Sequence, residues 1–465
     1  MQTSRHTAQP EDSHSRDLER MRKLERPSLP NWRLLIALVG YQTVLLFLLP
    51  IVFLRFLKLS YYEPEYRRHF LQRMGFGPVA PNPCVWVFAA SLGETRAASP
   101  VVKHFVESGY GVCLACSTPA GLQEARRLFS HQTARVVARY APLDFLPFVL
   151  IFFLRQRPVI GLVVEGELWP GYLSLGRLLG CPMMKINGNI IERSVERNNR
   201  SVLGRLRYEF MKLYFAVLTK TPSYRDRYLR AGVPDQRVFC VGEIKFDQWS
   251  PQEQLHAGQR LKDTWSPAGP ILAIASTIEE EEDPIFGMVS KLIAHPSKPR
   301  IIWVPRSPQR FDRVASRLAG LCRTVRRSEA LNADLSGPLP EGTMALVGDS
   351  IGEMNFYIAS ADLVFVGATI ADRGGHNIVE PLALKKPVLV GPSVRGIVYP
   401  ALVARDDGAL YIADGIEDLT RQISEILDDS DSLDAFTIQT SKFSEKHLGA
   451  SQRTFELAEV ALKAW

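Results

Sequence analysis

The sequence lacks the residue patterns that mark several common kinds of site. Its six cysteines in 465 residues are too few for a disulfide-stapled fold and favour a reducing compartment. It contains no P-loop, no GxSxG elbow and no His/Cys/Asp cluster with metal-ligand spacing. It also lacks a basic helix and zinc-finger spacing, and its net charge is only +7, which argues against nucleic acid. This modest positive charge fits an enzyme that meets anionic substrates or an anionic membrane face.

One long stretch without charge is present near the N-terminus. The 21 residues from Leu34 to Leu54 are rich in Leu, Ile, Val and Phe, and about 20 such residues cross a bilayer as a helix. No small-residue cleavage site follows, so a signal peptide is disfavoured. We predict a flexible polar tail over 1–30 and a membrane anchor helix over 31–59. The internal Pro50 leaves a shallow, in-plane helix open as the alternative to a spanning one.

Beyond the anchor, short apolar runs alternate with helix-like stretches. The alternation pauses over the polar stretch 248–268 and then restarts, which predicts parallel strands, crossover helices and two domains. We expect an α/β fold with two Rossmann-like domains, 60–250 and 251–465, that face a cleft. The predicted strands are Val85–Phe88, Gly111–Cys116, Val159–Val164, Met183–Ile186, Ile271–Ala275, Ile301–Val304, Ala345–Val347, Leu363–Val366 and Val388–Val390.

The clearest candidate binding segment is the run GGHNIVEP, residues 374–381, between a predicted strand and a helix. Glycines let a ligand approach the backbone, and the N–H groups of a helix start favour phosphate. The carboxylate of Glu380 is suited to a ribose hydroxyl. Asn377 followed by Glu380 is also an ordinary helix-start pattern. A nucleotide site and a plain cap therefore both stay open.

Other polar residues also follow predicted strands, where ligands of parallel sheets bind. Glu94 could act as a general base in a cleft, if burial raises its pKa. Glu165 and Glu167 follow a further strand and belong either to a site or to a solvated loop. Arg306 lies just past a strand and suits a phosphate. His376 is either an acid or donor, or a satisfied loop histidine.

Taken together, these segments resemble the family of 3-deoxy-D-manno-octulosonic acid (Kdo) transferases of lipopolysaccharide synthesis. The resemblance extends from the hydrophobic N-terminal segment to about residue 400 and rests on ordered blocks rather than on one motif. The blocks are Ala90–Glu94, Ala141–Asp144, Glu165–Pro170, Gly242–Asp247, Val304–Arg306, Gly352–Glu353 and Gly374–Pro381.

The resemblance implies an inverting GT-B glycosyltransferase with a single N-terminal anchor in the inner membrane and its catalytic domains at the cytoplasmic face. It implies transfer of Kdo from the donor CMP-Kdo to a lipid A precursor of the lipid IVA type, with no cofactor and no active-site metal. It assigns the role of general base to Glu94. The donor set that it implies is Arg306, Gly352, Glu353, Met354, Gly374, Gly375, His376, Asn377 and Glu380. The acceptor set is Ser91, Gly93, Arg96, Glu165, Glu167, Asn187 and Arg193.

The sequence departs from the family pattern mainly on the acceptor side. The departures are Glu243 in place of Asn, Ile278 and Ser307 in place of His, Asn189 in place of Arg, Gly166 in place of Thr, and Glu280 in place of Gly. The acceptor and the number of Kdo residues added therefore stay open. Two alternatives also stay open: a GT-B transferase that uses another nucleotide sugar, and a catalytically degenerate membrane-bound paralogue.

Overall fold

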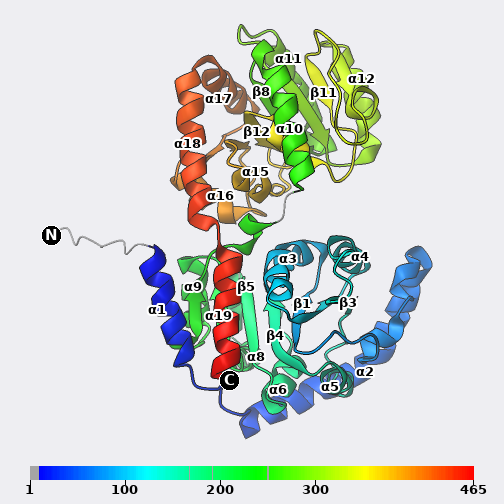
Figure 1. Cartoon of the computed structure of the whole chain (residues 1–465), viewed down its shortest axis with the longest axis vertical. Helices are drawn as coiled ribbons and strands as arrows, with labels where there is room; N and C mark the ends of the chain where they lie inside the picture. The colour runs from blue at the N-terminus through cyan, green and yellow to red at the C-terminus, as the bar shows by residue number, and fades with distance from the viewer. Residues whose placement is uncertain (1–9, 167, 191, 200, 249–250) are drawn as a thin grey trace, which may run out of the picture. The chain divides into compact units, whose positions relative to one another are not determined.

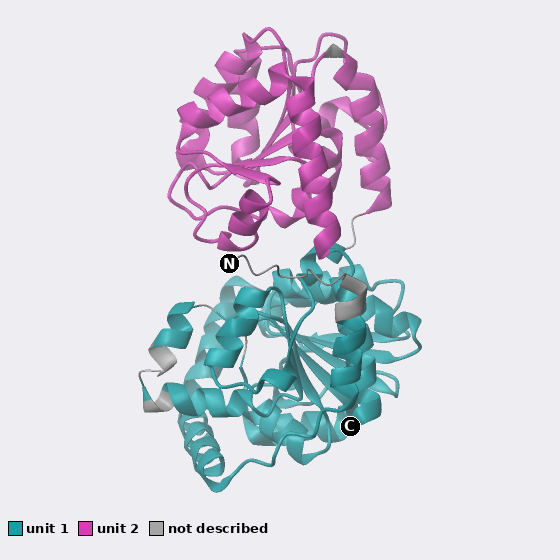
Figure 2. Cartoon of the chain, turned by 90° about the vertical axis from the view of Figure 1, so that its left-hand side faces the viewer, with its two compact units in different colours: residues 1–248, 448–465 teal, residues 249–447 magenta. Residues whose placement is uncertain are grey.

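The computed structural model describes residues 10–166, 168–190, 192–199, 201–248 and 251–465. These form two compact units, each built on a parallel sheet of seven strands (Figure 2). Unit 1 comprises Met1–Gln248 and Leu448–Trp465, and unit 2 comprises Trp249–His447. The predicted α/β fold with two doubly wound domains is therefore confirmed.

The sheet of unit 1 has the strand order β3-β2-β1-β4-β5-β6-β7. Its strands are almost wholly apolar because helices cover both faces of the sheet. The chain moves outward from β1 in one direction and from β4 in the other, so these neighbours form a topological switch point. The strands are β1 (Cys84–Ala89), β2 (Gly111–Cys116), β3 (Val136–Tyr140), β4 (Pro158–Val164), β5 (Met183–Gly188), β6 (Ala216–Thr219) and β7 (Val238–Cys240).

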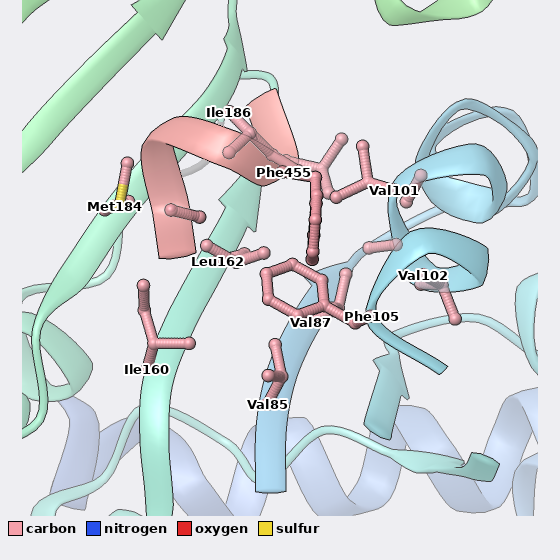
Figure 3. Close-up of a cluster of buried hydrophobic side chains, with 14 of the residues drawn as sticks. Val85, Val87, Val101, Val102, Phe105, Ile160, Leu162, Met184, Ile186 and Phe455 are labelled. Carbon is pink, nitrogen blue, oxygen red and sulfur yellow. The ribbon is translucent and has the colours of Figure 1, made fainter. Parts of the chain in front are cut away.

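One face of this sheet is covered by helices that lie far apart in the sequence. Phe105 and Val101 of one helix meet Phe455 of the C-terminal helix over Val87 and Leu162 (Figure 3). The helices of unit 1 are α1 (Pro10–Arg22), α2 (Trp32–Tyr62), α3 (Leu92–Glu107), α4 (Pro119–Leu128), α5 (Leu146–Gln156), α6 (Pro170–Leu178), α7 (Glu192–Asn199), α8 (Val202–Met211), α9 (Pro222–Arg230) and α19 (Ala450–Ala464). Short 3-10 turns include η1 (Pro64–Tyr66), η2 (Phe70–Met74) and η4 (Ile244–Asp247).

The two ends of the chain differ from the sequence-based expectation. Residues 10–22 of the predicted polar tail form α1, because Met21 is buried and Arg20 stacks over Phe239 at 4.1 Å. Residues 448–465, expected in the second domain, belong to unit 1. The apolar face of α19 explains this placement, since Phe455 packs edge-on against Phe105 at 4.9 Å.

The sheet of unit 2 has the order β10-β11-β9-β8-β12-β13-β14, with its switch point between β8 and β12. Its strands are β8 (Ile271–Thr277), β9 (Arg300–Pro305), β10 (Thr324–Arg326), β11 (Ala345–Val347), β12 (Leu363–Val366), β13 (Val388–Val390) and β14 (Leu410–Ile412). Its helices are α10 (Gln252–Trp265), α11 (Glu279–Ile293), α12 (Phe311–Ala319), α13 (Arg327–Ala330), α14 (Met354–Ser360), α15 (Val379–Ala383), α16 (Val398–Asp406), α17 (Ile416–Asp428) and α18 (Ser430–His447).

The polar stretch 248–268, expected to link domains, is largely the helix α10. This helix packs closely on α14, and a β-carbon on Gly258 would lie 2.6 Å from the Phe356 carbonyl oxygen. Ala257 and Leu261 are buried on the same side. The sequence is polar here because the other side of the helix faces solvent.

The long apolar helix α2 lies along unit 1 beside α5 and α6 (Figure 1). By length and composition α2 could cross a membrane, and it is the one helix among the described residues that meets both conditions. Asn31 caps its first turn by accepting a hydrogen bond from the Leu34 N–H at 3.0 Å. Leu34, Leu38 and Gln42 are buried against the unit, whereas most of the other apolar residues of the helix are exposed.

Candidate functional sites

Strained backbone marks the carboxyl ends of the central strands in both sheets. Four residues other than glycine take a left-handed conformation directly after strands or at strand ends there: Glu165 and Asn187 in unit 1, with φ of 58° and 52°, and Ser276 and Ala368 in unit 2, with φ of 58° and 60°. Such conformations cost free energy and are concentrated at functional sites. They flank the two switch points, where open parallel sheets bind ligands.

In unit 1, Glu94 lies in the first turn of α3, immediately beyond β1. Its Oε2 accepts a hydrogen bond from the Ser91 N–H at 3.0 Å, and its own N–H donates to Ser91 Oγ at 3.3 Å. The two hydrogen bonds form a reciprocal capping box. Gly93 and the partly exposed Glu94 side chain lie at the open edge of the sheet. The capping role and a proton-accepting role are compatible, because a carboxylate has several acceptor positions.

Other residues predicted for the acceptor are distributed around this edge. Arg96 is paired with Glu124 at 2.6 Å, and Arg127 pairs with the same carboxylate at 2.8 Å. The hydrogen bond from Arg127 and the Arg96 pair outweigh burial and hold the pKa of Glu124 at about 2. Arg193 lies exposed on α7. Glu167 lies outside the described residues.

Behind this edge lies a buried network of opposite charges. Lys220 is 2.9 Å from Glu243 and 3.4 Å from Glu165, and Lys245 is 2.7 Å from Glu165. Asn187 joins the two carboxylates, because its Nδ2 donates to Glu243 at 2.6 Å and to Glu165 at 3.3 Å. Lys185 donates to the Glu165 carbonyl at 2.7 Å. Glu165 and Asn187, predicted to bind the acceptor, are thus both held by protein groups.

The network fixes the charge of its members. Burial opposes ionisation of Glu165, but Lys220 and Lys245 outweigh it and hold the pKa of this carboxyl at about 2. Its stabilising effect is therefore complete above pH 4.5, its ordinary pKa, and is lost as the pH falls toward 2. The network also explains how this chain accommodates Glu243 where the family usually has asparagine. Lys220 neutralises the charge of the Glu243 carboxylate.

In unit 2, the buried carboxylate of Glu281 fastens the loop that follows β12. It accepts hydrogen bonds from the N–H groups of Ala368 at 2.6 Å, Thr369 at 3.2 Å and Ile370 at 3.3 Å. It also accepts from the Ile278 N–H at 3.1 Å, at the start of α11. Glu281 therefore ties together the loops after β8 and β12, the two strands at the switch point.

The glycine loop itself is held by the protein. Gly374 N–H donates to Ser393 Oγ at 3.0 Å, Gly375 N–H to the Ala368 carbonyl at 2.7 Å, and His376 N–H to the Gly367 carbonyl at 3.3 Å. Both glycines take a left-handed φ, of 90° and 88°. These three amides therefore serve to close the loop.

The start of the following helix is also hydrogen-bonded within its own segment. Asn377 Oδ1 accepts a hydrogen bond from the Val379 N–H at 3.0 Å, and α15 is only five residues long. A helix this short has a weak terminal dipole. Asn377 thus forms a local turn one residue before Ile378, which occupies the N-cap position, so the N-cap expected at Asn377 lies one residue later. Glu380 lies in the first turn of α15 and is partly exposed.

Two side chains beside this loop have the chemistry expected for an anionic ligand. Arg306 is exposed just past β9, and within the described part of the chain its guanidinium forms no ion pair. His376 Nδ1 lies 2.8 Å from the Ser276 carbonyl, so this nitrogen carries the proton and Nε2 is an acceptor. Burial, together with the nearby Arg306 charge, lowers the pKa of His376, which keeps the ring neutral at pH 7.

Glu353 belongs to a small polar cluster after β11. Arg327 donates to its Oε1 at 2.6 Å, and Ser350 Oγ donates to its Oε2. Gly352, with φ of 87°, turns the chain into α14, of which Met354 is the first residue. The loop after β11 is thus ordered by Arg327, and Gly352 and Glu353 lie at the carboxyl edge of the sheet.

Sequence reasoning missed the residues that hold these loops in place. Glu281 belongs to an acidic run that by itself indicates only the first turn of a helix, and no sequence motif contains Lys185, Lys220 or Arg327. One signal was present: Lys185 interrupts an apolar strand, where a buried cation requires a partner. The described residues contain no group of three or more His, Cys, Asp and Glu side chains placed to hold a metal.

We expect Glu281→Ala to loosen the loop after β12. Removing one carboxylate leaves four N–H groups without their acceptor, and each buried unpaired group costs about 1–3 kcal/mol. Hydrogen exchange at residues 368–370 should become at least about tenfold faster. The neighbouring variant Glu280→Ala removes only an exposed pair with Arg373 and should leave exchange unchanged. Equal exchange in both variants would contradict the assignment.

Comparison with known proteins gives one consistent match. The family model described as 3-Deoxy-D-manno-octulosonic-acid transferase (kdotransferase) matches residues 68–248. The 3-deoxy-D-manno-octulosonic acid transferase of Bordetella pertussis is 34% identical over 395 residues, which cover 82% of this chain and 89% of that protein. The protein of the same name from Haemophilus influenzae is 28% identical over 433 residues, covering 91% of this chain and 98% of that one.

Among solved structures, the UDP-GlcNAc 2-epimerase from Neisseria meningitidis bound to UDP-GlcNAc is similar to this chain. The TM-score is 0.55 at 12% identity, and the match covers 82% of this chain and 99% of that one. At this identity the likeness concerns the fold alone. With the two seven-stranded parallel sheets, it confirms the predicted GT-B architecture.

Proposed function

Because the chain belongs to the 3-deoxy-D-manno-octulosonic acid transferase family, we propose that it transfers Kdo from CMP-Kdo to a lipid A precursor of the lipid IVA type, with inversion at the anomeric carbon. The observation that carries this proposal is the 34% identity to a relative of that name across both units. The positions of the predicted site residues support it, since Glu94 and Arg306 lie at the carboxyl ends of central strands.

In the proposed reaction, Glu94 accepts the proton of the acceptor hydroxyl. The acceptor oxygen then bonds to the anomeric carbon while the bond from that carbon to the phosphate oxygen of CMP breaks. This single displacement inverts the anomeric configuration. The partly exposed carboxylate of Glu94 is held at its place by the Ser91 N–H, which orients it toward the open edge of the sheet.

The leaving nucleotide acquires negative charge on its phosphate, and Arg306 has the charge and the exposure to stabilise it. The neutral ring of His376 adds no positive charge, so in this proposal it orients the donor through Nε2 as an acceptor. Gly352, Glu353, Met354, Gly374, Gly375, Asn377 and Glu380 complete the proposed donor set. Glu380 is the candidate for the ribose hydroxyls.

We also propose that α2 attaches the enzyme to the cytoplasmic face of the inner membrane. The apolar length of α2 and the lipid acceptor of the proposed reaction support this location. No cofactor and no active-site metal belong to the proposed reaction, since the carboxylate and the arginine supply the base and the phosphate charge.

The proposal is tested by incubating the full-length chain with CMP-Kdo and a lipid A precursor and weighing the product by mass spectrometry. We expect release of CMP and an acceptor heavier by one or more Kdo residues, and the mass gives their number. Release of nucleotide only from UDP-sugars in a parallel donor panel would assign another donor. Failure to bind any cytidine nucleotide in calorimetry would identify a catalytically degenerate protein.

A further inference from the structure

Helix α2 is tied to unit 1 at two places far apart along its length. Near its start, Gln42 is buried, and its amide donates to the Asp144 carbonyl at 2.9 Å and accepts from the Leu146 N–H at 2.8 Å. Near its end, Phe53 lies edge-on against Phe70 at 5.2 Å, and the Arg73 guanidinium lies 4.5 Å above Phe56. The helix is thus held by the hydrogen bonds of Gln42 and by the ring contacts of Phe53 and Phe56.

The chain that leads into the helix is fastened as well. Arg177 of α6 donates to the Pro27 carbonyl at 2.5 Å, and Leu24 is buried in the core of unit 1. The N-terminal end of α2 therefore cannot move away from the unit without breaking these contacts. Both ends of the helix and the residues before it stay on the same body.

This double attachment is incompatible with a helix that crosses a bilayer. Gln42 and Phe56 are separated by about 21 Å along the helix axis, against a hydrocarbon core of about 30 Å. A spanning helix would hold its two tie points at different depths and would draw their partners into the hydrocarbon. Those partners include the buried cation of Arg73 and the polar backbone around Asp144. Charged and unpaired polar groups are excluded from that region.

The side of α2 that faces away from unit 1 is largely apolar. The exposed apolar residues of this side are three or four positions apart, as a single face of a helix requires, except that the exposed Thr43 lies between Val39 and Phe47. They are Trp32, Ile36, Val39, Phe47, Ile51, Leu54, Leu57 and Tyr61. The helix has no acidic residue, and its three charged side chains, Arg33, Arg55 and Lys58, are all exposed cations.

The apolar surface continues from α2 onto the neighbouring helix α8. A pocket of about 500 Å³ lies between Val44 of α2 and Leu206 and Phe210 of α8. Among the described residues that line it, Arg207 carries the charge. Apolar walls with a cation among them match lipid tails below an anionic headgroup.

From the two tie points and this face, we propose that α2 lies flat in the surface of an anionic phospholipid bilayer. Its outward face enters the acyl region, and Arg33, Arg55 and Lys58 contact lipid phosphates. Unit 1 thus binds one leaflet through the outward face of α2, and α2 does not span the bilayer. The inference requires no glycosyl transfer, so it stands or falls separately from the proposed reaction.

The decisive measurement is a depth profile along α2 in the full-length chain. Cys240 and Cys322 are replaced by serine, since the other four cysteines are buried, and single nitroxide-labelled cysteines are placed at successive positions from 32 to 62. The protein is added to preformed phosphatidylglycerol vesicles, and collisions with oxygen and with a nickel chelate report the depth of each label. A flat helix gives a depth that oscillates every 3.6 residues or so, with both ends equally deep. A single maximum at the helix centre, with shallow ends, would overturn the proposal.

A matched pair of variants tests the same surface by vesicle flotation. Ile51 on α2 is 60% exposed and Ile438 on α18 of unit 2 is 53% exposed. We expect Ile51→Glu to weaken vesicle binding about tenfold or more. The substitution removes an isoleucine side chain that the bilayer would bury, and it adds a negative charge that anionic lipids repel. Ile438→Glu should leave vesicle binding unchanged. Equal binding by the two variants, or dimerisation through α2 without vesicle binding, would overturn the proposal.

Discussion

Replacing Glu94 by glutamine is expected to lower kcat by about 10²–10⁴-fold, the usual contribution of a positioned general base. Glutamine can still accept the Ser91 N–H, so the capping box at the start of α3 is kept. The loss of activity should therefore appear without a loss of folding. The measurement is CMP release from CMP-Kdo under saturating acceptor, with CMP binding followed in parallel by calorimetry.

Glu107 provides the matched control, because it lies on the same helix as an exposed glutamate at the opposite end. Glu107→Gln should leave both turnover and CMP binding unchanged. Glu94→Gln should keep the affinity for CMP, since the proposed donor residues all belong to unit 2. Wild-type turnover in Glu94→Gln would show that another group accepts the proton.

Replacing Lys220 by methionine is expected to destabilise unit 1 by about 3–5 kcal/mol, the usual effect of removing one partner of a buried ion pair. Glu165 keeps Lys245 at 2.7 Å, so the unpaired charge falls on Glu243, which is 2% exposed. The free energy of unfolding should be measured by native-state hydrogen exchange of the β5 and β6 amides, which report on unit 1.

A second substitution separates a charge effect from a packing effect. In the Lys220→Met background, Glu243→Gln removes the stranded charge and keeps an acceptor for Asn187, so part of the lost stability should return. Lys212→Met removes a lysine from a half-exposed pair with Glu209 and should change stability by less than about 1 kcal/mol. No recovery in the double variant would show that the network is not held by charge pairing.

Nine strands could be predicted because each is an almost wholly buried apolar run, whereas β3, β6, β7, β10 and β14 were not predicted, and β3, β10 and β14 are only partly buried. Leu363–Val366 and Val388–Val390 have the predicted bounds, since a continuous apolar run between polar segments defines them locally. The membership of α1 and α19 in unit 1 was not predictable in the same way. It depends on Met21 and Phe455 finding partners far away in the sequence, and no local pattern encodes that distance.

The candidate sites show the same division. Glu94 and Arg306 could be placed because a polar residue directly after a buried strand must lie at the edge of the sheet. The hydrogen bonds of the Gly374 and Gly375 amides could not be predicted, because their acceptors come from Ser393 and Ala368 in other turns of the chain. The role of Glu281 could not be predicted for a related reason. An acidic residue is expected in the first turn of a helix, and only the structure shows its three hydrogen bonds with the loop after β12.

The return of α19 to unit 1 determines the order in which the protein can be completed on the ribosome. Residues 249–447 of unit 2 are synthesised before Phe455, Leu457 and Ala458 exist to cover Phe105 and its neighbours. Unit 2 can therefore close its sheet first, while one face of the earlier-made sheet still lacks its cover. The last eighteen residues complete the half of the molecule that was begun first.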